Sequence, residues 1–207
     1  FGQGLVTTVW LSVLSFAGAL AVGIGLAAMN LQRGRLFRIP AKAYIDAVRA
    51  TPLLAQLYFL YFGLPRLGII LPELVVGILA LSLNSGAYVA EIIRAGIQAT
   101  PRGQFEAGAS LAMTPFQTFW HVVLVPALQR IWPALSSQIV IVMLGSAVVS
   151  QIAAEDLTFA ANFIQSRNFR AFETYIVSTL IYLALAILLR QMLAGLGWML
   201  FLRKASR

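Results

Sequence analysis

Long apolar stretches alternate with short polar breaks along almost the whole chain. Crossing a bilayer takes about 20 mainly apolar residues, because each helical residue rises about 1.5 Å through a hydrocarbon core of about 30 Å. Five stretches are therefore predicted to be membrane-spanning helices: residues 5–30, 44–64, 72–97, 131–149 and 172–198. The first of them contains no charged residue. The pattern predicts an all-α integral membrane protein with five transmembrane helices.

The breaks between these stretches contain residues that end helices. Glycine, proline and charged residues gather at residues 33–35, 63–65, 100–103 and 155–156. The apolar pattern runs from end to end, so residues 1–207 are predicted to form a single transmembrane domain. One break, residues 100–126, is longer than a simple connector needs to be.

Composition agrees with a membrane protein and excludes other classes. The chain is 60% hydrophobic and 11% charged, whereas a soluble domain is about 45–50% apolar and about 25% charged. The absence of cysteine excludes disulfides and thiolate metal sites. The net charge of +8 would suit nucleic acid, but the basic residues form no contiguous patch with interleaved aromatics. We expect membrane lipid, and no nucleic acid, among the partners.

The basic residues also predict how the chain is oriented, because cytoplasmic segments are enriched in lysine and arginine. An N-terminus outside the cell leaves three basic residues outside: Arg66, Arg167 and Arg170. The same orientation places twelve inside: Arg33, Arg35, Arg38, Lys42, Arg49, Arg94, Arg102, Arg130, Arg190, Arg203, Lys204 and Arg207. The predicted topology is multi-pass, with the N-terminus outside and the C-terminus in the cytoplasm.

Two short helices are predicted in the long cytoplasmic break, at residues 105–112 and 116–124. Each follows a pair that can act as an N-cap and a proline at the first helical position, Thr100-Pro101 and Thr114-Pro115. Pro126 is expected to end or kink the second helix before the chain returns to the membrane. The result would be a compact knob on which another protein could push.

The same loop resembles a known motif. It reads Glu106-Ala107-Gly108-Ala109-Ser110-Leu111-Ala112, followed by Val123-Leu124-Val125-Pro126. This resembles the EAA motif of ABC importer membrane subunits, which runs Glu-Ala-Ala, three residues, Gly, nine residues, Ile-any-Leu-Pro. Upstream, residues 49–54 and 83–94 resemble the polar amino acid permeases of the histidine and glutamine transporter type. The resemblance covers residues 4–202.

The resemblance implies a type I ABC importer permease fold in a bacterial cytoplasmic (inner) membrane, carrying polar amino acids or close derivatives. It also implies a second permease subunit, identical or homologous, two ABC ATPase subunits and an extracytoplasmic substrate-binding protein. The cytoplasmic coupling helix would contact the ATPase through the motif residues, which are Glu106, Ala107, Gly108, Ala112, Met113 and Thr114.

The chain departs from the family pattern at several points. Ala112 stands where the motif has glycine, Gly108 stands where it has the second alanine, and Pro126 comes one residue late. Family members commonly have lysine, an acidic residue and serine in the fourth helix, whereas this chain has Leu144-Gly145-Ser146. The chain therefore lacks the charged pair that family members commonly carry in the fourth helix.

No nucleotide-binding motif is present. A P-loop needs glycine, four residues, then Gly-Lys-Ser/Thr, and the two lysines, Lys42 and Lys204, do not follow a glycine. We therefore expect no enzymatic activity in this chain and no cofactor or metal, with ATP hydrolysis on a partner chain.

Ionisable residues inside the predicted spans are functional candidates, because burying them in lipid is costly. Asp46 and Arg49 are three residues apart and are expected to pair with each other. Glu91 and Arg94 have the same spacing and the same expectation. The alternative is that Glu91 faces the translocation route and binds the amino group of an amino acid.

Polar residues near mid-membrane are the other candidates for a substrate pathway. Asn84 and Ser85 lie near the middle of the third span, where transporters hold substrate, although a hydrogen bond between helices would explain them equally well. Gln56 in the second span and Ser146 in the fourth are weaker candidates.

Other interpretations fit less well. An intramembrane hydrolase using Ser85 would need a histidine at membrane depth, but His121 lies in the cytoplasmic loop. A channel or secondary carrier would need more buried carboxylates than Glu91. The amphipathic external segment, residues 153–170, is expected to lie along the membrane surface or to meet a delivery protein.

A stripe of small residues in the first span, Ala17, Ala21, Gly25 and Ala28, indicates close helix packing in a bundle or a dimer.

Overall fold

A computed structural model of the chain describes residues 1–32 and 34–202, which fold entirely into helices and short connections. The elements are α1 Gly2–Leu31, α2 Arg35–Arg49, α3 Leu53–Arg66, α4 Glu73–Gln98, α5 Arg102–Ser110, α6 Pro115–Thr118, a π-turn Phe119–Val123, α7 Leu124–Gly145, a 3₁₀ segment Ser146–Ile152, α8 Leu157–Asn168, α9 Ala171–Gly197 and a π-turn Trp198–Leu202.

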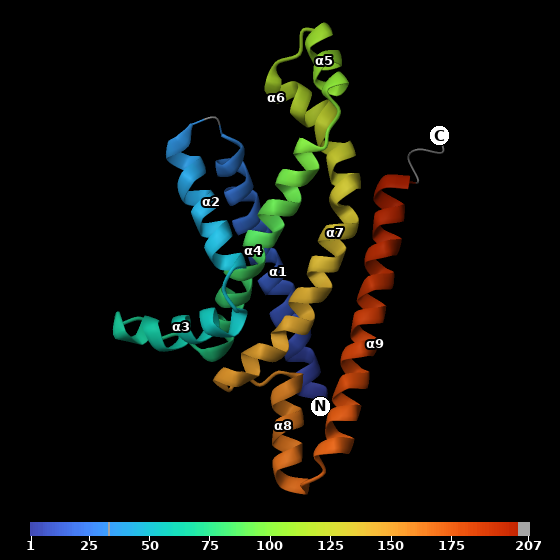
Figure 1. Cartoon of the computed structure of the whole chain (residues 1–207). Helices are drawn as coiled ribbons and strands as arrows, with labels where there is room; N and C mark the ends of the chain where they lie inside the picture. The colour runs from blue at the N-terminus through green and yellow to red at the C-terminus, as the bar shows by residue number, and fades with distance from the viewer. Residues whose placement is uncertain (33, 203–207) are drawn as a thin grey trace.

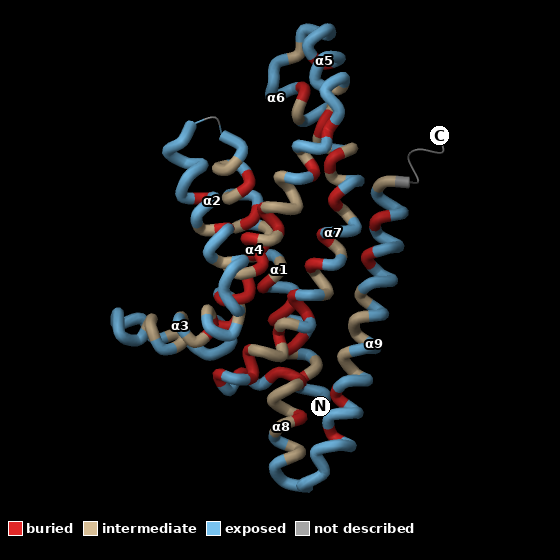
Figure 2. The backbone as a smooth tube through the Cα atoms, viewed as in Figure 1, coloured by how far each residue is buried: buried red, intermediate tan, exposed pale blue. Residues whose placement is uncertain are grey.

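Long apolar helices form the body of the molecule. In the described residues, four helical runs are long and apolar enough to cross a membrane: Gly2–Leu31, Glu73–Gln98, Pro115–Ile152 and Ala171–Phe201. In Figure 1, α1, α4 and α9 run in one direction and α7 runs in the other. Buried residues concentrate where α1, α4 and α7 meet, whereas α9 and α3 are mostly exposed (Figure 2).

The predicted second span, residues 44–64, is wrong as a single helix. The chain forms α2 and α3 instead, which are 15 and 14 residues long and separated at Ala50–Pro52. Pro52 has no N–H to donate and disfavours a helical conformation at Thr51, which favours a break in the helix here. Gln56 Nε2 donates to Val48 O at 2.9 Å and to Thr51 Oγ1 at 2.7 Å, which stabilises the break. Beyond it, α3 projects from the bundle (Figure 1).

The predicted fourth span, residues 131–149, begins earlier than expected. The π-turn at Phe119–Val123 joins α6 to α7, which starts at Leu124, so helical structure continues from the loop into the span. Pro126 therefore neither ends nor interrupts this helix. It lies inside the continuous helical run Pro115–Ile152, two residues after Leu124, whose N–H donates to Phe119 O across the π-turn.

The contact face of α1 is not the predicted stripe. Ala17, Ala21, Gly25 and Ala28 are all exposed in this chain. The buried face carries a different set of small residues: Gly4, Thr8, Ser12, Ser15, Ala19, Gly23 and Ala27. Ala19 and Gly23 pack on α4, where a Cβ added at Gly23 would lie 2.5 Å from Val89 Cγ1. Close packing of α1 through small residues is confirmed, but within the chain it uses other residues than the predicted stripe, whose packing in a dimer stays a prediction.

The segment 153–170, which the sequence predicts to be external, does not lie across the ends of the long helices. Its helix, α8, runs alongside the first turns of α9 (Figure 1). Tyr175 donates to Asn162 Oδ1 at 2.8 Å, and Thr158 Oγ1 lies 2.9 Å from the Tyr182 hydroxyl. These bonds hold α8 and α9 as a hairpin. That this segment lies along the membrane surface or meets a delivery protein stays a prediction.

Candidate functional site

The loop α5–α6 stands clear of the helical bundle at the end where α4 finishes and α7 begins (Figure 1). Thr114 caps α6 with a complete capping box: its hydroxyl accepts from Gln117 N at 3.3 Å, and Gln117 Oε1 accepts from Thr114 N at 2.9 Å. The predicted start at Thr114-Pro115 is confirmed. The predicted N-cap at Thr100 is wrong, because α5 begins one residue after Pro101 and its N-cap has no side-chain bond.

The structure explains two of the departures from the motif, those at Gly108 and Ala112. Gly108 is buried against α6, and a Cβ there would lie 2.5 Å from Thr118 Oγ1. Ala112 has a left-handed backbone, with φ of 53°. The α5 helix ends in a Schellman motif, in which Met113 N donates to Gly108 O and Ala112 N donates to Ala109 O, both at 3.0 Å. Glycine is the residue that adopts this conformation without strain.

The outer surface of this loop is accessible and partly apolar. Glu106, Ala107, Ala112 and Thr114 are exposed, and Met113 is half-buried. Large apolar side chains lie beside them in the open: Phe105, Leu111, Phe116 and Trp120. Exposed apolar side chains gathered on a segment outside the bundle mark a surface that another protein can cover.

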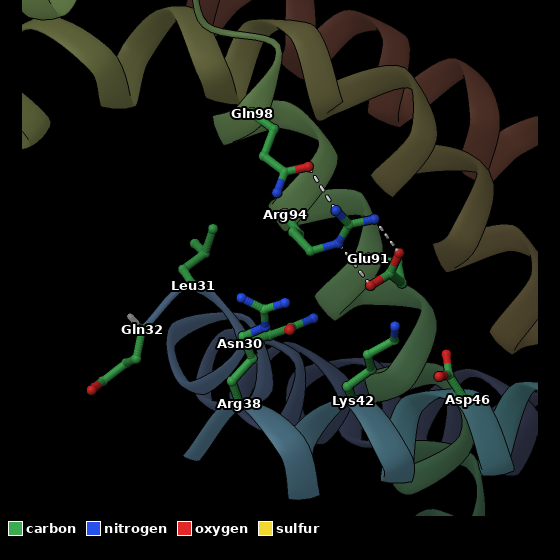
Figure 3. Close-up of a pocket in the computed structure, with 9 residues that line it drawn as sticks. All are labelled: Asn30, Leu31, Gln32, Arg38, Lys42, Asp46, Glu91, Arg94 and Gln98. Atoms are coloured by element: carbon green, nitrogen blue, oxygen red, sulfur yellow. Dashed lines mark hydrogen bonds and ion pairs between the residues drawn. The ribbon is translucent and has the colours of Figure 1, made fainter. Parts of the chain in front are cut away.

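A second candidate site is a hollow of about 490 Å³ between the ends of α1, α2 and α4. Figure 3 shows side chains of α2 and α4 facing the same space. Its polar lining residues are Asn30, Gln32, Arg38, Lys42, Asp46, Glu91, Arg94 and Gln98. The hollow therefore offers charges of both signs at one end of the bundle.

Glu91 is held by arginine within this hollow. Arg94 Nε and Nη2 donate to its two oxygens at 2.9 and 2.7 Å, and Arg94 Nη1 donates to Gln98 Oε1 at 2.6 Å. The predicted pair Glu91–Arg94 is confirmed. The predicted pair Asp46–Arg49 is wrong, because Arg49 lies 3.8 Å from Glu91 Oε2 and its guanidinium stands over the Tyr88 ring.

The other predicted pathway residues are only partly brought together. Asn84 Nδ2 donates to Gln56 Oε1 at 3.1 Å and so joins α4 to α3. A hydrogen bond between helices was one of the two interpretations of Asn84. Ser85 is buried against neighbouring helices. Ser146 is fully buried and donates to Met143 O in its own turn at 2.7 Å. Asn84 and Glu91 are seven residues apart and lie on one face of α4.

A third polar site, which sequence analysis treated only as part of an amphipathic segment, lies at the opposite end of the bundle. Asp156 is fully buried. One carboxyl oxygen caps α8 by accepting from Phe159 N at 2.8 Å, and the other accepts from the Tyr182 hydroxyl at 3.2 Å. Thr8 on α1 accepts from Leu157 N at 3.1 Å. Asp156 thus links α8 to α9 where both meet α1.

The ionisation of Asp156 should make this junction sensitive to pH. Burial raises the pKa of Asp156 from 3.8 to about 6, despite the bonds from Phe159 and Tyr182. The folded chain therefore holds the proton more tightly than the unfolded chain. The resulting stability is present below about pH 4 and is lost as the pH rises through about 6.

Asp156→Asn should remove this dependence, because asparagine keeps the cap and carries no charge. A shift of about two pKa units corresponds to about 3 kcal/mol as an upper limit. Melting temperatures in detergent between pH 4 and pH 7.5 should fall for the native chain and stay level for Asp156→Asn. Glu155→Gln, at the exposed neighbour, is the control and should behave as the native chain. If the melting temperature of Asp156→Asn fell with pH as it does in the native chain, Asp156 would not be the source of the pH dependence.

A bundle of long apolar helices with an exposed two-helix loop at one end defines a multi-pass membrane protein with a surface for a soluble partner. Residues 19–196 match the family described as "Binding-protein-dependent transport system inner membrane component". The chain belongs to this family. It is a multi-pass inner-membrane transport component and not an ATPase, and such systems include ATPase and binding-protein partners.

Individual relatives agree. The "Probable amino-acid ABC transporter permease protein y4tG" of Sinorhizobium fredii is 40% identical over 81% of this chain and 72% of its own length. The "Probable glutamine ABC transporter permease protein GlnM" of Bacillus subtilis is 33% identical over 89% of this chain and 86% of its own length.

Solved structures agree as well. A chain from a crystal structure of an amino acid ABC transporter with histidines has a TM-score of 0.88 and 38% identity, covering 94% of this chain and 91% of its own. A chain of the MetNI methionine ABC transporter shares the fold, with a TM-score of 0.79 and 16% identity over 96% of this chain and 94% of its own.

Proposed function

We propose that this chain is the permease subunit of an ABC importer that carries polar amino acids or close derivatives across the bacterial cytoplasmic membrane. The observation that carries the proposal is the similarity to the amino acid transporter chain, at 38% identity over 94% of this chain. The curated relatives described above are amino-acid or glutamine permeases by name, which supports the same substrate class.

The proposed topology has five crossings, with α2 and α3 together making the second. The N-terminus lies outside and the C-terminus in the cytoplasm. The end of α1, the start of α2 and the loop α5–α6 lie at one end of the bundle (Figure 1), and this end carries the described basic residues Arg35, Arg38 and Arg102. Four further residues counted as cytoplasmic, Arg33, Arg203, Lys204 and Arg207, lie outside the described residues.

The proposed coupling surface is the loop α5–α6. In the full complex, one ATPase subunit would bind this loop, and another would bind the corresponding loop of a second permease, identical or homologous. A binding protein would deliver substrate from outside. The proposed contact residues are Glu106, Ala107, Ala112, Met113 and Thr114, while Gly108, buried against α6, shapes the loop behind them. The exposed apolar side chains beside them support a protein partner.

The proposed substrate route passes Gln56, Asn84 and Glu91, with Ser85 and Ser146 behind it as buried support. The hollow next to Glu91 suits a zwitterion on release. Arg38 and Lys42 can attract a carboxylate, while Asp46 can attract an ammonium group. Among the described residues these three side chains make no ion pair, so their charges remain available.

Transport by the reconstituted complex tests the proposal. The chain is assembled with its ATPase and second permease in vesicles, and uptake of radiolabelled glutamine or histidine is followed with the binding protein added outside. Uptake should require both ATP and the binding protein. Uptake at the same rate without ATP would contradict the proposal and favour a channel or secondary carrier.

Glu91→Gln should reduce uptake about tenfold to a hundredfold. The substitution removes the negative charge beside Arg94 and Arg49 and leaves one of the two oxygens that accept from Arg94. Leaving a partly buried charge unpaired costs about 1.5–3 kcal/mol. Two unpaired guanidiniums would then hold the substrate carboxylate. Glu73→Gln, an exposed carboxylate at the other end of α4, should keep uptake within about twofold. Native uptake by Glu91→Gln would exclude Glu91 from the route.

A further inference from the structure

Arg190 is an arginine inside a membrane-spanning helix. It lies on α9 in the run Ala171–Phe201, whose apolar window has a mean hydropathy of 2.0. It is exposed, and among residues 1–32 and 34–202 no carboxylate pairs with it. An isolated guanidinium at the lipid-facing surface of a span is costly, so it needs an anionic partner or a position at the membrane interface.

Arg190 lines a groove between α7 and α9 of about 520 Å³. The groove is bounded by Trp132 at the cytoplasmic end of the helices, where Trp132 Nε1 donates to Leu193 O at 3.0 Å and the Trp132 ring meets the Phe201 ring. Its walls are mainly apolar, formed in part by Val140 and Ile141.

The groove also contains a free hydroxyl. Ser137 donates to Pro133 O at 3.1 Å, whereas the Ser136 hydroxyl makes no hydrogen bond within the part of the chain that the structure describes. Arg190 and Ser136 are therefore two hydrogen-bond donors among the residues that line one groove. A phosphate group accepts from both kinds of donor.

The depth of Arg190 suits a lipid headgroup. Arg190 follows Ala171 by nineteen residues, which is about 28 Å along a helix, and the hydrocarbon core is about 30 Å thick. If α9 enters the membrane near Ala171, the guanidinium reaches the opposite interface. Val140 and Ile141 lie about one turn deeper than Ser136, because α7 runs toward the other face.

We infer that this groove binds one anionic phospholipid, with its phosphate on Arg190 and Ser136 and an acyl chain along Val140 and Ile141. Basic pockets between helices on the cytoplasmic side bind anionic headgroups, and only 11% of the apolar window of α9 is buried within this chain. The leaflet rests on the orientation proposed above, whereas binding itself does not depend on the transport function.

Native mass spectrometry of the assembled transporter tests the inference. The complex is delipidated in detergent and titrated with phosphatidylglycerol or phosphatidylcholine. The native complex should retain phosphatidylglycerol with at least tenfold preference, and Arg190→Gln should reduce retention about tenfold. Ser136→Ala should reduce it about threefold, and Arg170→Gln, a change of the same charge away from the groove, should not alter it.

Other outcomes would overturn the inference. Competition by millimolar inorganic phosphate would indicate a site for a free anion rather than a lipid. Equal retention by the native complex and Arg190→Gln would exclude Arg190. Cross-linking of cysteines placed at positions 140 and 187 to the second permease would show that a protein covers the groove. Loss of retention with unchanged uptake would still support the lipid site, so this test is separate from that of transport.

Discussion

Glu106→Lys should abolish ATP-driven uptake while leaving the membrane fold intact. Glu106 is exposed on α5, and its side chain makes no hydrogen bond or ion pair among the described residues. The substitution therefore removes nothing that stabilises this chain. At a docking surface, placing a like charge opposite a partner costs several kcal/mol, which corresponds to at least a hundredfold weaker assembly with the ATPase.

Two measurements separate docking from folding. Copurification of the ATPase with a tagged permease should be lost in Glu106→Lys, whereas the melting temperature of the isolated permease should change by less than about 2 °C. Glu173→Lys makes the same change of charge in the first turn of α9, at the other end of the bundle, and should retain the ATPase. Copurification and uptake at native levels in Glu106→Lys would remove the coupling assignment.

The shape of the loop α5–α6, the proposed coupling surface, was only partly predictable. The pair Thr114-Pro115 carries its own local signal, an N-cap followed by proline, and the structure has a capping box there. The end of α5 carries no such signal, because alanine at position 112 predicts a continuing helix. The left-handed Ala112 becomes understandable only through the motif, which has glycine at that position, and through the contact of Gly108 with Thr118.

The break between α2 and α3 shows a different limit. Pro52 is visible in the sequence, but the apolar residues after it fit a continuous span when a window is averaged. Averaged hydropathy measures how apolar a segment is and says nothing of its direction. The direction depends on side chains that form hydrogen bonds with the backbone where the helix is interrupted. Gln56 is the main one, because its side chain donates to Val48 O and Thr51 Oγ1. From the sequence alone, Gln56 was placed only in a substrate pathway.

Ion pairs show why the site could be predicted only locally. Glu91 and Arg94 lie on one helix at a spacing of three, which brings side chains together in any α-helix. Asp46 and Arg49 have the same spacing, yet Arg49 lies beside Glu91 on α4. Spacing within a helix cannot reveal a competing partner on another helix.

Gly23→Leu should strongly destabilise the folded chain. Gly23 lies in the contact between α1 and α4, where an added Cβ would be 2.7 Å from Val89 Cβ and 3.1 Å from Ala90 N. The second of these is backbone and cannot move aside. Overpacking a core costs about 1–3 kcal/mol or more, and a leucine adds three further carbons. We expect a fall in melting temperature of at least 10 °C, with aggregation during purification.

Gly25→Leu is the matched control, because it places the same side chain two residues away on the same helix. No atom lies within 4 Å of a Cβ added at Gly25, and leucine favours a helix over glycine by about 1 kcal/mol. The isolated chain should melt at or above the native temperature, and equal damage from both substitutions would mean that the contact face of α1 is wrong.

Gly25 also belongs to the exposed stripe of Ala17, Ala21 and Ala28. If Gly25→Leu melts normally but no longer copurifies with the second permease, the stripe packs between subunits, because only an absent neighbour could then collide with the added leucine.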